Sequence, residues 1–444
     1  MRLLFAGVLC SAAAFAATAP SQITFYKDVL PVLQKNCQGC HRPGEAAPMS
    51  FLTYDQTRPW AKAMKQAVLT KQMPPWFADP HYGKFANDRT LSQADIETLV
   101  SWADTGAKPG DAKDAPKPIN WVEGWRIGKP DMVIEMPHPF EVPASGTIDY
   151  QYIVIPTHFT EDKYVQIAEA RPGNPALVHH IIAFIREPGS PWLKDAEPGV
   201  PFVPKDHVRT ENLTPEQRRQ QASRNGGGFG GDFLAGYAPG VTPFILRPGE
   251  ARMVKAGSDI VLQMHYTANG KPGEDQSRIG LIFAKEKPTA RVLTLAAANN
   301  EFAIPPGDAN YEVDAKLKLQ RDVTLVDLLP HMHFRGKSFE YRITYPSGEK
   351  ETLLDVPKYD FNWQLVYTLA EPKVLPAGTL IECTAHFDNS PNNKYNPDPT
   401  KTVYFGEQTW EEMMIGFFDV RVPMDVTAMD IMRPPQQQKR SGAL

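Results

Sequence analysis

Two histidines separated by one residue form the clearest candidate metal-binding motif in the sequence. His331 and His333 flank Met332 and follow the β-branched run 322–326, which predicts a strand. Side chains two positions apart on a strand project from the same face. If the strand continues to His333, the two imidazoles can therefore bind one borderline-soft metal ion such as copper or zinc.

Three further histidines lie on other predicted strands. His179 and His180 are adjacent within 178–185, and His265 lies within 260–266. Adjacent residues on a regular strand point to opposite faces, so both imidazoles of the pair reach one metal ion only at a strand end or a distortion. One buried and one exposed histidine is the alternative interpretation of the pair.

A different chemistry is indicated nearer the start of the chain, where Cys37, Cys40 and His41 stand in the sequence Cys-Gln-Gly-Cys-His. This is the attachment pattern of c-type haem, in which two thiols bind the vinyl groups and the histidine binds the iron. A redox cysteine pair leaves His41 unexplained, and no second Cys-x-x-Cys completes a zinc site. The motif predicts one covalent haem c and leaves Cys383 as a lone thiol that we expect to be buried.

Helical patterns surround the haem motif, at 23–35, 60–70 and 92–103. Together with the motif they make residues 22–107 similar to the small cytochromes c. Such a domain needs a second axial ligand, and Met49, Met64 and Met73 are the candidates. Met64 lies inside a helical pattern, where core packing is its ordinary role, and Met49 is close to the attachment motif. We expect Met73 to bind the iron opposite His41, because it follows a helix and precedes two prolines.

Residues 1–19 have the features of a secretory signal peptide. Arg2 precedes the apolar run 3–14, and small residues suitable for cleavage follow that run. The run is too short for a permanent membrane anchor, and no later stretch approaches the length of a membrane span. We therefore expect an exported protein, either periplasmic or secreted.

The composition is typical of a globular chain with several domains. Its 444 residues exceed the usual size of one hydrophobic core, 22% are charged and the formal net charge is −4. That charge provides no basic face for nucleic acid. The 42 prolines and 31 glycines suit short strands joined by many turns.

The sequence pattern changes from helical to β-rich beyond a Pro- and Gly-rich linker predicted at 108–119. Strand-like segments then recur, beginning with 132–136, 150–155, 164–168 and 178–185. Such spacing predicts antiparallel sandwiches. A long charged, Gly-rich loop at 187–236, with a helical patch at 214–222, interrupts the rhythm and is either a mobile lid or an insertion. The tail at 431–444 is predicted to be disordered.

Taken in order along the chain, these segments resemble the copper type II, ascorbate-dependent monooxygenases, the family of the peptidylglycine-hydroxylating and dopamine β-hydroxylating enzymes. The family pattern is an adjacent His pair, a later His-Tyr at a strand end, a His-x-His and a Met after acidic residues. The matching positions here are His179, His180, His265, His331, His333 and Met413. The resemblance covers about 120 to 425, and the cytochrome c part is fused in front of it.

The resemblance implies two eight-stranded antiparallel, jelly-roll-like sandwich domains, at 120–287 and 288–430, each with one copper and facing the other across a solvent cleft. The electron-transfer copper would be held by His179, His180 and His265. The copper at which dioxygen attacks a substrate C–H bond would be held by His331, His333 and Met413, with Met414 as the rival thioether.

Two departures from the family pattern concern the substrate. Peptide-amidating members carry an Arg and a Tyr that hold the substrate carboxylate, and the corresponding positions here are Leu329 and Phe417. The disulfides of the animal enzymes cannot form either, because Cys383 has no spare partner. Substrate identity therefore does not carry over, and an apolar or neutral substrate, either a small molecule or peptide-like, is favoured over a glycine-extended peptide.

The expected function is that of an exported haem c and copper monooxygenase. It would hydroxylate a C–H bond with dioxygen, and the haem domain would relay electrons to two mononuclear copper sites, fed by an external electron donor. A non-catalytic periplasmic electron-transfer or copper-binding protein that retains the fold is the alternative hypothesis.

Overall fold

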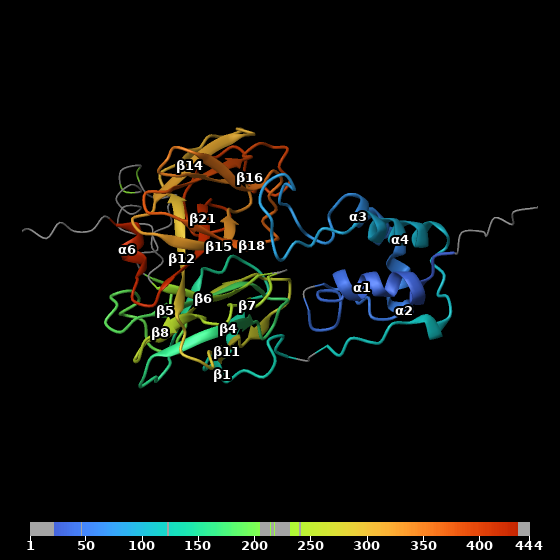
Figure 1. Cartoon of the computed structure of the whole chain (residues 1–444), viewed down its shortest axis with the longest axis horizontal. Helices are drawn as coiled ribbons and strands as arrows, with labels where there is room; N and C mark the ends of the chain where they lie inside the picture. Colours follow the sequence, from blue (N-terminus) through green and yellow to red (C-terminus); the bar gives the residue numbers. More distant parts are fainter. Residues whose placement is uncertain are drawn as a thin grey trace, which may run out of the picture. The chain divides into compact units, whose positions relative to one another are not determined.

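The computed structural model describes residues 22–433 except 46, 122–123, 205–213, 215–216, 218–230 and 239–240. The chain divides into two compact units (Figure 1), Met1–Pro74 with Leu91–Ile119, and Pro75–Thr90 with Asn120–Leu444. Short helices build the first unit and strands dominate the second, so the prediction of a mainly β, multidomain chain is confirmed. None of the helices in the described part has the length and apolarity that a membrane span requires.

Several predictions fall on residues that the structure does not describe. They are the signal peptide, most of the helical patch at 214–222 and the tail beyond Arg433. At the start of the predicted tail the structure differs from the expectation. Ile431 is buried in the short helix α6 (Ala428–Met432), which a capping box between Thr427 and Asp430 begins.

The three predicted helical patterns of the first unit are present as η1 (Phe25–Val29) with α1 (Leu30–Asn36), as α3 (Ala61–Leu69) and as α4 (Gln93–Asp104). The structure adds α2 (Tyr54–Thr57), η2 (Arg58–Trp60), which leads into α3, and η3 (Ala112–Asp114), which lies in the predicted linker. Ser92 caps α4 by accepting a hydrogen bond from the Asp95 N–H at 3.1 Å. The buried side chains of Phe25, Leu33 and Trp102 join the helices in one core. Residues 108–119, the predicted linker, belong to this unit. The first residue of this segment is bound to the helices, because the Lys108 carbonyl accepts a hydrogen bond from the Phe25 N–H at 2.9 Å.

The second unit contains two pairs of facing β layers, each pair enclosing its own hydrophobic core. In the N-terminal pair, the order β1-β11-β4-β8 faces β3-β9-β5-β6. The strands of this part of the unit are β1 (Met132–Glu135), β2 (Phe140–Val142), β3 (Gln151–Pro156), β4 (Lys163–Arg171), β5 (Val178–Arg186), β6 (Asp232–Tyr237), β7 (Phe244–Ile245), β8 (Glu250–Val254), β9 (Asp259–Tyr266), β10 (Gly273–Asp275) and β11 (Arg278–Phe283). Of these, β2 and β10 form a separate two-stranded sheet. The strands predicted around the first histidine group, β5 and β9, are adjacent and antiparallel.

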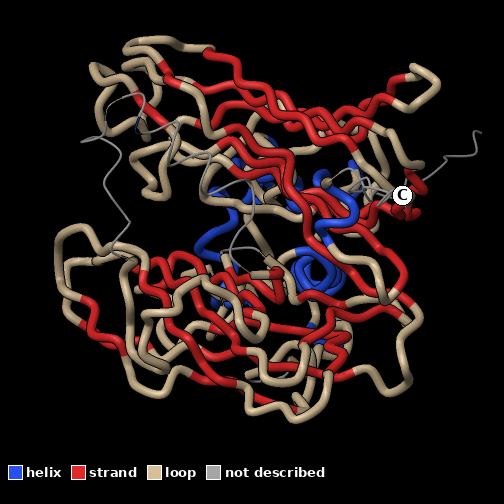
Figure 2. Tube along the Cα trace, turned by 90° about the vertical axis from the view of Figure 1, so that its left-hand side faces the viewer, coloured by secondary structure: helices blue, strands red, loops and turns tan. Residues whose placement is uncertain are grey.

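In the C-terminal pair, the order β12-β21-β15-β18 faces β14-β19-β16-β17. The strands of this part of the unit are β12 (Ala290–Asn299), β13 (Ala303–Ile304), β14 (Tyr311–Lys318), β15 (Val323–His331), β16 (Gly336–Thr344), β17 (Lys350–Val356), β18 (Tyr367–Leu375), β19 (Leu380–Phe387), β20 (Val403–Tyr404) and β21 (Met414–Pro423). Of these, β13 and β20 form a separate two-stranded sheet. A short parallel pairing of β8 with β12 joins the two pairs, so one large sheet runs through both. Figure 2 shows these strands in red.

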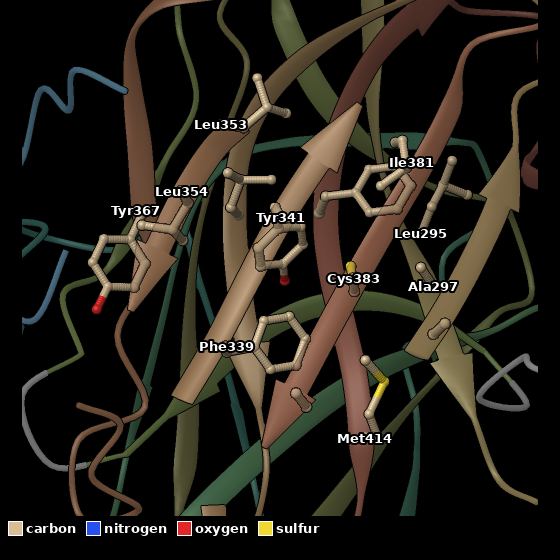
Figure 3. Close-up of a cluster of buried hydrophobic side chains, with 14 of the residues drawn as sticks. Leu295, Ala297, Phe339, Tyr341, Leu353, Leu354, Tyr367, Ile381, Cys383 and Met414 are labelled. Carbon is tan, nitrogen blue, oxygen red and sulfur yellow. The ribbon is translucent and has the colours of Figure 1, made fainter. Parts of the chain in front are cut away.

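Alternating burial along the C-terminal strands fills the core between them. Figure 3 shows Tyr341, Cys383 and Met414 pointing into this core from three different strands. Cys383 is a free thiol with no exposed surface, as expected from the sequence. The core therefore supplies a rigid support for the residues at the strand ends.

Candidate metal centres

The first histidine group forms at an irregularity in strand β5. The pairing of β5 with β9 shifts register between Val178 and His180, and His180 then stands opposite His265. This bulge removes the strict alternation of side chains, so that His179 and His180 can turn toward the same place. The ligand atoms of His179, His180 and His265 all lie within 4.8 Å of one another. The distortion that the sequence required for a shared site is therefore present.

The environment of this first cluster keeps its imidazoles neutral. Burial lowers the pKa of His265 to about 3, and burial together with the neighbouring histidines lowers the pKa of His180 well below its usual value. His265 Nδ1 is buried without a hydrogen-bond partner. The Tyr150 ring lies 4.8 Å from the His265 ring and 5.4 Å from the His180 ring, measured between centroids. Three neutral imidazoles, one of which has a buried nitrogen without a hydrogen-bond partner, fit a cation such as copper, which would bind their free lone pairs.

The second histidine pair stands at the end of β15. The ring centroids of His331 and His333 are 5.2 Å apart, and burial lowers the pKa of His331 to about 4. The Nδ1 atom of His331 donates to Gln364 Oε1 at 3.0 Å, and that of His333 donates to the Glu411 carbonyl at 3.3 Å. With each Nδ1–H engaged by an acceptor, Nε2 of each ring keeps a lone pair for a metal ion. The pair therefore fits the expected copper site.

The two adjacent methionines have different environments. Met414 has no exposed surface and packs in the C-terminal core beside Cys383 (Figure 3). Met413 directly precedes β21 and is 7% exposed, but it does not belong to that core. Core packing occupies the thioether of Met414, so the structure favours Met413 as the candidate ligand.

A buried carboxyl group connects Met413 to the histidine turn. The carboxyl oxygens of Glu412 accept hydrogen bonds from the backbone N–H groups of His333 at 2.9 Å and Arg335 at 2.6 Å. Burial raises the pKa of Glu412 to about 8, while these N–H groups oppose the rise. Sequence reasoning noted acidic residues before the methionine and did not identify this positioning role.

Replacing Glu412 with alanine is expected to destabilise the fold by about 2–6 kcal/mol, because the buried backbone N–H groups of His333 and Arg335 lose their acceptor. Urea unfolding of the purified protein measures the change. Glu340, a half-exposed partner of Arg342, provides the control, since Glu340→Ala should cost less than about 1 kcal/mol. Equal losses in both variants would contradict the role of Glu412.

The loop between β17 and β18 contacts both histidine groups. Phe361 stacks on His179 with ring centroids 5.1 Å apart and planes at 10°, and it meets His333 edge-on at 5.9 Å. His331 and His333 also contribute to the lowered pKa of His180. Between His179 and His333 the structure therefore has an aromatic ring where the resemblance implies solvent. No motif in the sequence identified Phe361.

The haem motif forms a tight turn at the end of α1. The N–H groups of Cys40 and His41 both donate to the Cys37 carbonyl, at 3.1 and 2.9 Å, which gathers the three side chains on one turn. Both thiols are free, and the His41 ring stacks on Phe51 at 4.3 Å. Burial lowers the pKa of His41, which favours the neutral imidazole. Two free thiols beside a neutral imidazole fit a covalently bound haem c.

The three candidate methionines also differ in burial. Met64 is 8% exposed and belongs to the core of the first unit, and Met49 packs against the same core. Met73 is half-buried and lies outside that core. Met73 is thus the candidate whose thioether is least committed to packing, and its role as iron ligand stays a prediction.

Replacing Met73 with alanine should abolish the sulfur-to-iron absorption band of the ferric protein while the haem stays attached, because Cys37, Cys40 and His41 are unchanged. Absorption spectra of the variant and of denatured samples measure both properties. Met49→Ala and Met64→Ala are the controls and should keep the band. Loss of the band in either control instead of Met73→Ala would show that the ligand was assigned wrongly.

No protein-family model matches the sequence, and no curated protein matches it either. Among solved structures, the chain resembles VP54 of PBCV-1, at 10% identity over 68% of this chain and 97% of that chain, with a TM-score of 0.23. It also resembles PNGF-II, at 12% identity over 66% of this chain and 60% of that chain, with a TM-score of 0.22. Likenesses at such low scores carry no inference about fold or function.

Proposed function

We propose that this chain is an exported haem c and copper monooxygenase that hydroxylates a C–H bond of an apolar or neutral substrate. In this proposal it belongs with the copper type II monooxygenases and carries a fused cytochrome c domain. The observation that carries the proposal is the convergence of His179, His180 and His265 within 4.8 Å. These residues come from two strands about eighty positions apart, and the family resemblance implies that the three bind one copper ion.

The second site supports the proposal through the way its donors are held. When bound, copper in a set of three histidines and a set of two histidines with a methionine supplies one-electron redox chemistry and reactivity toward dioxygen, with soft and neutral ligands favouring Cu(I). Gln364 and the Glu411 carbonyl orient His331 and His333 through Nδ1. Glu412 holds the segment of Met413 against the same turn. These contacts preorganise the donors and limit rearrangement on binding.

The surroundings of His331 support an apolar substrate. Leu329 and Phe417 are directly paired across β15 and β21, and the Phe417 ring lies 6.1 Å from the His331 ring. Leu329 shares a strand face with His331 because the two are two positions apart. The two positions that bind a carboxylate in peptide-amidating enzymes are therefore an apolar pair beside the candidate oxygen-reacting site.

Glycine-extended peptides are accordingly expected not to be substrates. An unpaired carboxylate placed beside Leu329 and Phe417 would lose several kcal/mol of hydration, which corresponds to a loss in binding on the order of a thousandfold. Incubation of the purified protein with such a peptide, copper, dioxygen and a reductant, followed by mass spectrometry, tests this. Efficient peptide amidation would refute the prediction.

The course of the chain supports delivery of electrons from the haem domain. The chain passes between the two units three times, after Pro74, Thr90 and Ile119. The segment 75–90 packs within the β unit. The ring centroids of Trp76 and Tyr367 are 4.8 Å apart, and the backbones of Phe85 and Leu369 form an isolated antiparallel β-bridge. It starts two residues after Met73, the proposed iron ligand. Such short covalent connections keep a donor at high effective concentration near its acceptor.

Metal analysis tests the proposed function. Protein produced with cytochrome c maturation and copper available should contain one iron and two copper ions per chain, and oxygen consumption should depend on substrate. His331→Ala should lower copper to one ion per chain. The alternative, a non-catalytic electron-transfer or copper-binding protein, predicts redox cycling without substrate-dependent oxygen consumption. A single copper, or zinc at full occupancy, would contradict the two-site proposal.

A further inference from the structure

One aromatic ring contacts histidines of both clusters. Phe361 lies face to face with His179, at 5.1 Å, and edge-on to His333, at 5.9 Å. The ring centres of His179 and His333 are therefore separated by at most the sum of these two distances. Phe361 itself is 9% exposed, so packed atoms fill this part of the path between the clusters.

The loop that carries Phe361 is fixed to the second cluster. The Met332 N–H donates to the Tyr359 hydroxyl at 3.1 Å, and that hydroxyl lies 2.9 Å from the Met332 carbonyl, to which it donates. Gln364 donates from Nε2 to the Phe361 carbonyl at 2.9 Å and accepts from His331 through Oε1. Two side chains of the loop thus attach it to the His331–His333 turn, one on each side of Phe361.

The loop also has an internal structure that limits its movement. The Asp360 carboxylate accepts from the Asn362 N–H at 3.0 Å, and the Asp360 carbonyl accepts from the Trp363 N–H at 2.9 Å. These bonds close a compact turn around Phe361. The position of the ring is therefore set by the C-terminal sheets, while its face rests on a histidine of the N-terminal sheets.

We infer that Phe361 is a positioning residue that fixes the separation of the two copper sites and excludes water from the space between His179 and His333. This inference rests on the proposed function, because it concerns metals bound at both clusters. It adds that electrons passing between the sites cross a packed aromatic contact instead of open solvent. Removing the ring should let the two clusters move apart and let water enter between them.

Electron paramagnetic resonance of the copper(II)-loaded protein tests the inference without using catalysis. Two paramagnetic ions at short range broaden each other's spectra, and the effect falls steeply with distance. The uncoupled reference is the sum of the spectra of His331→Ala and His180→Ala, each loaded at its remaining site. We expect wild-type protein with both sites loaded to be broader than this sum, and Phe361→Ala to lose most of the excess broadening.

Two variants make the test specific. Phe361→Leu keeps an apolar side chain without an aromatic face and should lose part of the excess broadening. If the alanine variant does not fold, this leucine variant provides the test in its place. Phe302 has similar burial, at 7% exposed, and stacks on Phe387 in the same core, so Phe302→Ala should keep the wild-type broadening. Unchanged broadening in both Phe361 variants with two copper ions bound would overturn this inference and leave the proposed function standing. Fewer than two copper ions in wild-type protein would overturn the proposed function itself.

Discussion

Replacement of Met413 with isoleucine is expected to stop substrate oxidation and to weaken one copper site while the other stays loaded. Isoleucine keeps the apolar bulk of the side chain and removes the thioether sulfur. Loss of a partner outside the ligand set already costs about 10–100-fold in metal affinity, so loss of a ligand should cost at least about 100-fold. Copper titration and X-ray absorption of the reduced protein, which detects copper–sulfur scattering, measure the change.

The neighbouring methionine provides a matched control for this experiment. Met414→Ile makes the same chemical change one residue later, inside the core, and should cost less than about 1.5 kcal/mol of stability as a near volume-conserving substitution. It should retain both copper ions, the sulfur scattering and oxidation. If Met414→Ile loses the sulfur signal and Met413→Ile keeps it, the ligand assignment is reversed.

The second large effect concerns electron delivery by the haem. A monooxygenase turnover needs two electrons beyond those taken from the C–H bond, and the proposed haem c is a one-electron carrier within the same chain. When protein with reduced haem and oxidised copper is prepared by rapid mixing, we expect haem oxidation at a rate independent of protein concentration. The reason is that the donor and acceptor are covalently connected.

Two controls separate this relay from a cytochrome that serves another partner. Protein depleted of copper should keep its haem reduced over the same interval, and His179→Ala should slow haem oxidation strongly because the acceptor site is damaged. Haem oxidation that is equally fast in His179→Ala, or a haem that stays reduced in the copper-loaded protein, would show that the haem does not feed this site.

Local patterns in the sequence predicted much of the architecture. The helices at 60–70 and 92–103 and the strands that became β5, β9 and β15 all follow from short-range periodicity. Because His179 and His180 are adjacent in the sequence, they can share a site only if the strand is distorted. Whether the distortion exists depends on how β5 registers with β9, and that is a long-range property.

The parts that could not be predicted depend on tertiary contacts without a local signature. Phe361, Gln364 and Tyr359 occupy a loop between strands, and nothing in their spacing indicates that they meet both histidine clusters. The role of Glu412 likewise depends on backbone donors about eighty residues away. The choice between Met413 and Met414 required the observed core, because both residues have the same chemistry.

The central claim is that this protein inserts one oxygen atom of dioxygen into a C–H bond. The most direct test is a screen of a metabolite mixture with the copper- and haem-loaded protein, a reductant and isotopically labelled dioxygen, read by mass spectrometry. We predict a product that gains one labelled oxygen atom in wild-type protein and does not form with Met413→Ile. Reductant oxidation without any labelled product, at equal rates in both proteins, would contradict the claim and favour a non-catalytic electron-transfer or copper-binding protein.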